Sequence, residues 1–144
     1  MQHLHLLAWS VFARVHRLFC LHADALAISS GIARSWTEQM GYPVIQASSS
    51  AAAGKVTLSV SQAWFMGDGS LVTPEEQKTW QLPLLISSKS NPEPKLYTFD
   101  SSSAEIVVEG AQAGDWINVN AGHVTPARVE YSPELLEALK TAVR

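Results

Sequence analysis

Histidine is the residue type in this 144-residue chain that is best suited to bind a metal or to move a proton near neutral pH. The five histidines are His3, His5, His16, His22 and His123. None is followed by Glu and none lies four residues from another His, so no pair shares a helix face at metal-binding spacing. His3 and His5 could share a metal only on a strand or loop. His123 lies in a predicted turn, where a solvated side chain is expected.

Serine could act as a nucleophile, but its placement here does not point to catalysis. Two serine runs, residues 48–50 and 101–103, have no His and Asp partners nearby in sequence, and no Gly-x-Ser-x-Gly motif is present. A triad that assembles only in space stays open. Residues 46–54 (QASSSAAAG) lack the Gly-x4-Gly-Lys-Ser/Thr pattern of a phosphate-binding loop. The sequence therefore predicts no catalytic, cofactor-binding or metal-binding residues.

Tryptophan offers a different chemistry, because its large flat ring can bind a sugar or a peptide. Trp36, Trp64, Trp80 and Trp116 all occupy positions where a core aromatic residue is expected. A core role is therefore the favoured interpretation, and an exposed binding platform is the alternative.

Two helices are predicted in the first part of the chain. Apolar residues recur there at steps of three and four: Leu4, Leu7, Val11, Val15, Leu18 and His22. A second helix has Asp24 as its candidate cap and a buried side: Ala25, Ile28, Ile32 and Trp36. Residues 29–31 (SSG) could break or kink it. Gly41 suits the positive φ that ends a helix, and Pro43 cannot continue one.

After residue 43 the apolar residues mostly alternate, which predicts strands. Val56, Leu58 and Val60 predict a strand over residues 55–65 with one buried face. Trp80, Leu82, Leu84 and Ile86 do the same for residues 79–87, where Pro83 indicates an edge strand or a bulge. Residues 46–54 are small and of low complexity, so a flexible loop is predicted there. Turns are expected at residues 67–70 and 73–76, and shorter strands at residues 95–99, 105–109, 116–120 and 127–131.

The last part of the chain begins another helix. Ser132 is a good cap, Pro133 suits the first helical position and Glu134 suits the first turn. The helix has an apolar stripe that nothing downstream pairs: Leu135, Leu136, Leu139, Ala142 and Val143. This favours a helix that belongs to a neighbouring, truncated domain.

Six or so short strands with turns every 8–12 residues are typical of a β-sandwich. The expected fold is therefore mainly β, a sandwich with flanking helices that belong to neighbouring domains. Residues 1–45 form the helical segment, residues 46–131 the β-sandwich domain, and residues 132–144 the first helix of a helical domain.

Composition narrows the cellular setting and the partners. The formal net charge of −3 gives no reason to expect nucleic acid or an anionic membrane as a partner. The single Cys20 cannot form an intrachain disulfide, so nothing indicates an oxidising compartment, and a cytoplasmic location is expected. No apolar run reaches the roughly 18 residues of a membrane span. Arg14 and Arg17 lie inside and after the apolar run, unlike the charges of a secretory signal, and a transit peptide stays open.

Several segments together resemble one enzyme family. Residues 36–44 (W-T-E-Q-M-G-Y-P-V) are similar to a junction in zinc aminopeptidases of the aminopeptidase N family, most of all its puromycin-sensitive branch. Later segments agree in order: residues 56–65 (V-T-L-S-V-S-Q-A-W-F), 80–84 (W-Q-L-P-L), 116–120 (W-I-N-V-N) and 128–131 (R-V-E-Y). The resemblance runs from Asp24 to the C-terminus and leaves residues 1–22 unmatched. The family's aromatic residues just before Arg128 are absent here.

The resemblance implies a zinc aminopeptidase as the parent protein, which removes N-terminal residues from peptides. It places this chain after the catalytic domain, with the catalytic domain and a C-terminal helical domain as its partners. The family's His-Glu-x-x-His motif and its Gly-x-Met-Glu-Asn segment are absent, so no functional residue of the family carries over and the chain is expected to be inactive alone. Zinc is accordingly expected in the parent but not here. The alternative is a free-standing β-sandwich module that binds a peptide or a carbohydrate.

Overall fold

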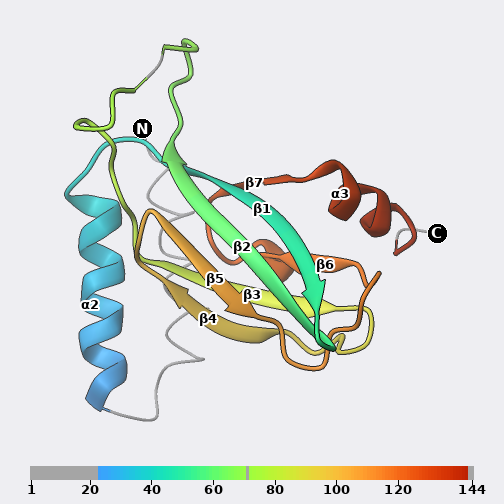
Figure 1. Cartoon of the computed structure of the whole chain (residues 1–144). Helices are drawn as coiled ribbons and strands as arrows, with labels where there is room; N and C mark the ends of the chain where they lie inside the picture. Colours follow the sequence, from blue (N-terminus) through green and yellow to red (C-terminus); the bar gives the residue numbers. More distant parts are fainter. Residues whose placement is uncertain (1–22, 71, 143–144) are drawn as a thin grey trace.

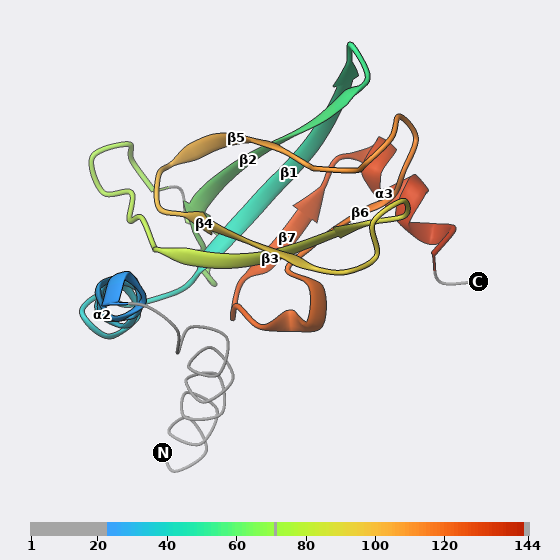
Figure 2. The ribbon, with the colours of Figure 1, turned by 90° about the horizontal axis from the view of Figure 1, so that it is seen from below.

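The computed structural model describes residues 23–70 and 72–142, and it shows a mainly β protein with two sheets (Figures 1 and 2). A long helix stands beside one end of the sheets, and a short helix follows the last strand. The elements in chain order are α2 (Ala23–Thr37), β1 (Pro43–Ala52), β2 (Lys55–Trp64), β3 (Leu82–Ser88), β4 (Lys95–Phe99), β5 (Ser103–Val107), β6 (Ile117–Val119), the 3-10 helix η1 (Ala121–His123), β7 (Arg128–Tyr131) and α3 (Pro133–Lys140). The predicted fold class is confirmed.

The strands form a four-stranded sheet in the order β5-β2-β1-β7 and a three-stranded sheet in the order β4-β3-β6. The long antiparallel hairpin β1–β2 pairs Pro43 with Trp64 at one end and Ala52 with Lys55 at the other. Strand β7 returns parallel to β1, so the last strand closes the larger sheet against the first.

The core lies between the two sheets and follows the predicted alternation. Val56, Leu58 and Val60 of β2 are at most 5% exposed. From the other sheet come side chains that are at most 2% exposed: Trp80, Leu82, Leu84, Ile86, Phe99, Ile117 and Val119. Each fully buried Leu, Ile or Val stabilises the fold by roughly 1.5–3 kcal/mol, so this layer holds the two sheets together.

The prediction of a flexible loop over residues 46–54 is wrong. Most of this stretch belongs to β1, and only Ala53 and Gly54, with φ of 50° and 73°, form the tight turn to β2. The serines and alanines pair in register with β2 all along the hairpin, so backbone hydrogen bonds stabilise the strand. Small side chains face solvent there, which removes the apolar alternation that would have indicated a strand.

The interpretation of Pro83 as an edge-strand residue is also wrong, because β3 is the central strand of its sheet. Strand β6 pairs only with residues Ile86 to Ser88, so the missing amide hydrogen of Pro83 lies beyond that pairing. The carbonyl of Pro83 instead accepts a hydrogen bond from the Thr125 hydroxyl. The proline is therefore tolerated in a central strand because the neighbouring strand is short.

The described helices refine the remaining expectations. Helix α2 continues unbroken through residues 29–31, so the suggested kink is wrong, and Asp24 lies inside the helix instead of capping it. Gly41 has the predicted positive φ, at 99°. Neither helix in the described part of the chain is long and apolar enough to cross a membrane. The helix predicted over residues 1–22 lies outside the described residues.

Candidate functional site

The histidines predicted to be uninvolved in metal binding are only partly within the described structure. His123 is exposed in η1 with φ of 52°, in agreement with a solvated turn. His3, His5, His16, His22 and Cys20 lie outside the described residues. Across residues 23–70 and 72–142 no group of three or more His, Cys, Asp or Glu could hold a metal ion. These residues therefore do not fit a zinc site, and no chemical step is derived through a metal.

The two serine runs lie on the surface without a catalytic arrangement. Ser48, Ser49 and Ser50 are exposed on β1. In the other run, the Ser101 hydroxyl donates to the Ser103 carbonyl at 2.9 Å. Within the described residues no hydrogen bond joins either run to His123. Among the described residues no general base contacts these hydroxyls, which can donate and accept hydrogen bonds.

The outer face of the four-stranded sheet forms a shallow trough of about 750 Å³. Across it runs one row of residues in register, Ser103, Ser61, Gln46 and Glu130, each from a different strand. The next row contains Glu105 beside Ser59 and Ser48. Most of the lining side chains are small, which leaves the space above the strands open. Residue-level prediction missed this trough, because its serines are separated by up to 84 positions in sequence.

The trough is acidic as well as hydroxyl-rich. Its charged lining residues are Glu105 on β5 and Glu130 on β7, at the two edges of the sheet. The Ser61 hydroxyl donates to the Gln46 side-chain oxygen at 3.4 Å. Such a surface can form hydrogen bonds with a polar segment and favours positive charge, but it carries no arrangement that breaks bonds.

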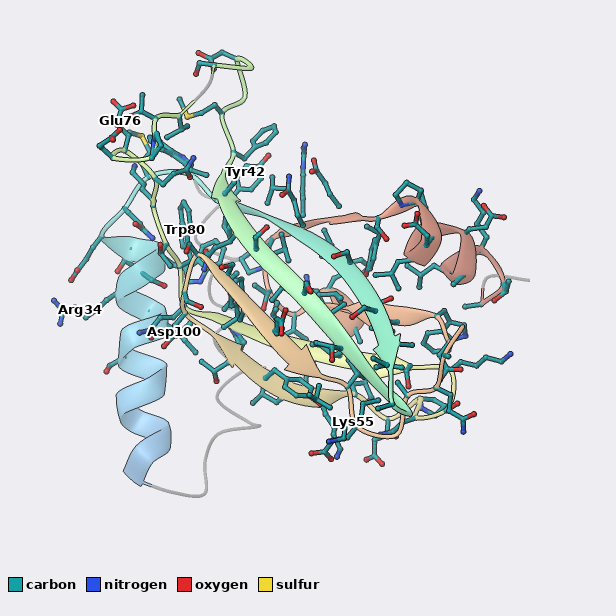
Figure 3. All side chains as sticks on the ribbon, viewed as in Figure 1. Arg34, Tyr42, Lys55, Glu76, Trp80 and Asp100 are labelled. Atoms are coloured by element: carbon teal, nitrogen blue, oxygen red, sulfur yellow. The ribbon has the colours of Figure 1, made fainter. Side chains whose placement is uncertain are left out.

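A second surface lies at the end of the sandwich where β1 begins, which Figure 3 marks by Tyr42. The rings of Tyr42 and Phe65 stack with centroids 4.9 Å apart. The Arg128 guanidinium lies over this stack, 4.7 Å from the centroid of Phe65 and 5.6 Å from that of Tyr42. Next to it, Lys78 Nζ lies 3.6 Å above the Trp64 ring. We call Met40, Tyr42, Phe65, Lys78 and Arg128 the cationic end.

Three of the tryptophans in the described part of the chain, Trp36, Trp64 and Trp80, pack against the core. Trp80 is fully buried, and Trp36 packs on it with ring centroids 6.2 Å apart and a 48° tilt. Trp64 is partly buried against the same core. The Trp80 Nε1 atom is buried without a hydrogen-bond partner in the described structure. The core interpretation of Trp80 is therefore confirmed. Because Trp80 is buried, it cannot contribute to a tryptophan-lined binding face.

Tyr131, the last residue of the Arg-Val-x-Tyr segment, connects the two sheets. Its hydroxyl accepts from the Val119 amide at 2.9 Å and donates to the Val119 carbonyl at 3.0 Å. Burial raises the pKa of this hydroxyl, and the hydrogen bond to Val119 offsets part of the rise. Tyr131 therefore acts as an uncharged structural link instead of an acid or base.

Asp115 and Glu109, two carboxylates with lowered pKa values, lie on a loop and a turn away from the trough. Partial burial pushes the pKa of Asp115 up, but hydrogen bonds from Gln112 and Ser90 outweigh it, so the net shift is downward. Glu109 has a lowered pKa and Lys95 a raised one, because the two side chains form an ion pair. Each shift has a local structural cause, and none indicates a catalytic group.

These features define a class of protein, a β-domain built from two packed sheets. No protein-family model matches the chain. Among curated proteins, the puromycin-sensitive aminopeptidase of Caenorhabditis elegans is 34% identical over 106 residues, which is 72% of this chain. The chain spans only 11% of that relative's length. The chain is therefore related to aminopeptidases, which confirms that level of the resemblance.

Proposed function

We propose that this chain is a non-catalytic β-sandwich domain of a zinc metallo-aminopeptidase and that it connects the catalytic domain to a C-terminal helical domain. The match to a small share of a much longer aminopeptidase supports this role. The absence of His-Glu-x-x-His from the sequence supports it as well. The parent removes N-terminal residues from peptides in the cytoplasm, and a zinc-activated water supplies that chemistry.

The observation that carries the proposal is the attachment of α2 to the sandwich. The Ser35 hydroxyl accepts from the Gln81 amide at 3.2 Å, and Gln39 donates to the Thr79 carbonyl at 3.0 Å. Lys78 donates to the Met40 carbonyl at 3.2 Å. The Ser35–Gln81 bond and the Trp36–Trp80 contact fix helix α2 to the segment before β3, and the bonds of Gln39 and Met40 fix the linker that follows the helix. A connector needs such a rigid link, because a loose helix would not hold a preceding domain in place.

Purified chain, supplied with stoichiometric zinc, tests the absence of catalysis. We expect no hydrolysis of an alanyl reporter above the buffer rate and no stoichiometric zinc retained after equilibrium dialysis. The C. elegans aminopeptidase serves as the positive control for the reporter. Turnover that copurifies with the chain and is lost on zinc removal would refute the connector role.

The serine trough supports a second candidate, a free-standing module that binds a peptide or a carbohydrate. Such a module should be a well-behaved monomer, whereas a connector taken out of its parent exposes surfaces that other domains cover. Size-exclusion chromatography with an apolar dye separates the two. Dye binding and association favour the connector, and a monomer that binds no dye favours the free module.

A further inference from the structure

The cationic end holds two positive charges that have no carboxylate partner in the described structure. The three ion pairs among the described residues are Arg34–Glu38, Lys95–Glu109 and Lys140–Glu137. Arg128 and Lys78 take part in none of them. Both cations instead lie over aromatic rings, at 4.7 Å from Phe65 and 3.6 Å from Trp64.

Contacts with aromatic rings restrict the orientations of these two cationic side chains and leave their donors available to an external partner. A guanidinium over a ring keeps its N–H donors at the rim available, while the ring limits the orientations of the side chain. Arg128 is exposed, so its donors can reach a partner's carboxylate in the two-pronged geometry that Arg favours. The cost of ordering the side chain on binding is reduced accordingly.

The neighbouring residues have the composition of a protein interface. Met40 is 77% exposed although it is apolar, and it lies directly before Gly41 and Tyr42 at the same end of the sandwich. Tyr42 and Phe65 are half-buried beside it, and Met, aromatic residues and Arg are enriched at the centres of protein–protein interfaces. Helix α2 ends near this surface, and its linker to β1 passes beside it, whereas the helix begins at the far end of the sandwich (Figure 1).

We infer that the cationic end is the docking surface for an acidic face of the parent's catalytic domain, with Arg128 and Lys78 paired to carboxylates of that domain. This inference rests on the proposed function. Charge complementarity selects an acidic partner, and the position beside α2 selects the domain that precedes the sandwich. The match leaves most of the relative's length outside this chain, which provides that domain.

The test uses a transplant enzyme, the C. elegans aminopeptidase with this chain's residues in place of its matched segment. Arg128→Gln and Lys78→Gln are combined in one variant. The control variant is Lys55→Gln, an exposed cation at the start of β2, next to the turn at the far end of the β1–β2 hairpin (Figure 3). The readout is the rate of heat inactivation at low salt and in 0.5 M NaCl, with urea unfolding of each isolated chain as the measure of its own stability.

We expect the double variant to lose activity at least fivefold faster than the unmodified transplant at low salt. High salt should shrink the difference, because it screens ion pairs. The Lys55→Gln variant should match the unmodified transplant. The inference is overturned if the double variant matches Lys55→Gln, or if its loss is no greater than the isolated chain's own loss of stability explains. An unmodified transplant that folds but is inactive would instead overturn the proposed function itself.

Discussion

At the scale of single residues, Gln62 is the buried polar side chain on which the fold depends most clearly, because it forms three hydrogen bonds with backbone groups. It is 8% exposed, and its amide donates to the carbonyls of Trp80 and Ser101 at 3.0 and 2.8 Å. Its oxygen accepts from the Trp80 amide at 2.9 Å. One side chain thus satisfies three backbone groups near the sandwich core, where an unpaired polar group is costly.

Replacement of Gln62 by Leu should therefore be strongly destabilising although it keeps the side-chain size. The Trp80 amide and two carbonyls would lose their partner, at about 1–3 kcal/mol for each group that stays buried. We expect a loss of roughly 2–4 kcal/mol in urea unfolding. The exposed Gln112→Leu variant is the control and should change stability by about 0.5 kcal/mol or less. Equal effects of the two variants would show that the Gln62 bonds contribute nothing.

Asp115 should make the free energy of unfolding depend on pH in the acid range. Its pKa in the folded chain is lowered from the ordinary value of 3.8, so the folded chain stabilises the ionised carboxylate. The stability it contributes is complete above pH 3.8 and is lost as the pH falls through the lowered value. Asp115→Asn should therefore flatten the decline in the free energy of unfolding between pH 5 and pH 3. An unchanged slope would contradict this role.

At the residue scale, sequence patterns predicted the core but not the surface sites. Alternation was sufficient to place Trp80 in the core, because inward positions on a strand repeat every second residue. The same pattern gave no sign of the trough or of the Arg128 stack. Both depend on pairing between distant strands, such as Gln46 with Glu130, and register is not visible in one sequence.

At the scale of elements, the junction between α2 and β1 depends on Gly41. Its φ of 99° is unfavourable for other residues, and a Cβ built there would lie 2.2 Å from Trp64 Nε1. The Trp64 ring is partly buried against the core, so a Cβ at residue 41 would require this ring or the backbone to shift. The glycine therefore turns the chain between α2 and β1 and lets it pass close to an aromatic side chain.

Gly41→Ala should destabilise the chain more than Gly54→Ala does. Both positions have positive φ, which costs a non-glycine residue about 1–3 kcal/mol. The space around Gly54 is open, so only the Gly41 variant adds a clash. Urea unfolding of the two variants isolates that added cost, and equal losses would mean that Trp64 moves freely.

Helix α3 should depend on one apolar side chain. Ser132 caps it by accepting from the Leu135 amide, and Leu135 is 3% exposed against the sandwich. Leu135→Ala should cost about 2–5 kcal/mol in thermal or urea unfolding. Leu136 is 49% exposed, so Leu136→Ala should change stability by about 0.5 kcal/mol or less. A reversed order would show that the helix packs on a different face.

The start of α3 was predictable because Ser-Pro-Glu is a local signal that needs no tertiary context. Strand β1 was not predictable beyond Ala47, because its serines and alanines are strand residues only through pairing with β2. The two outcomes differ in where the stabilising contacts lie. Local caps can be read along the chain, whereas pairing with a neighbouring strand cannot.

At the scale of the whole molecule, the chain is a sandwich to which one helix is firmly attached. Helix α2, predicted to belong to a preceding domain, is attached to the segment before β3 through Ser35, and the linker after the helix is attached through Gln39. This attachment would hold a domain that precedes α2 in a fixed position relative to the sandwich. The aminopeptidase relationship was accessible from short segments in order, but the trough and the cationic end needed the three-dimensional structure, because their residues come from separate strands and loops.

The most direct test of the connector role compares two altered forms of the C. elegans aminopeptidase. One is the transplant enzyme, and the other is the C. elegans aminopeptidase with a Gly-Ser linker of equal length in place of the matched segment. Hydrolysis of an alanyl reporter is measured for both at equal concentration. The connector role predicts that the transplant hydrolyses the reporter at least tenfold faster than the linker enzyme. Equal rates would contradict it, because a flexible chain would then replace the sandwich without loss.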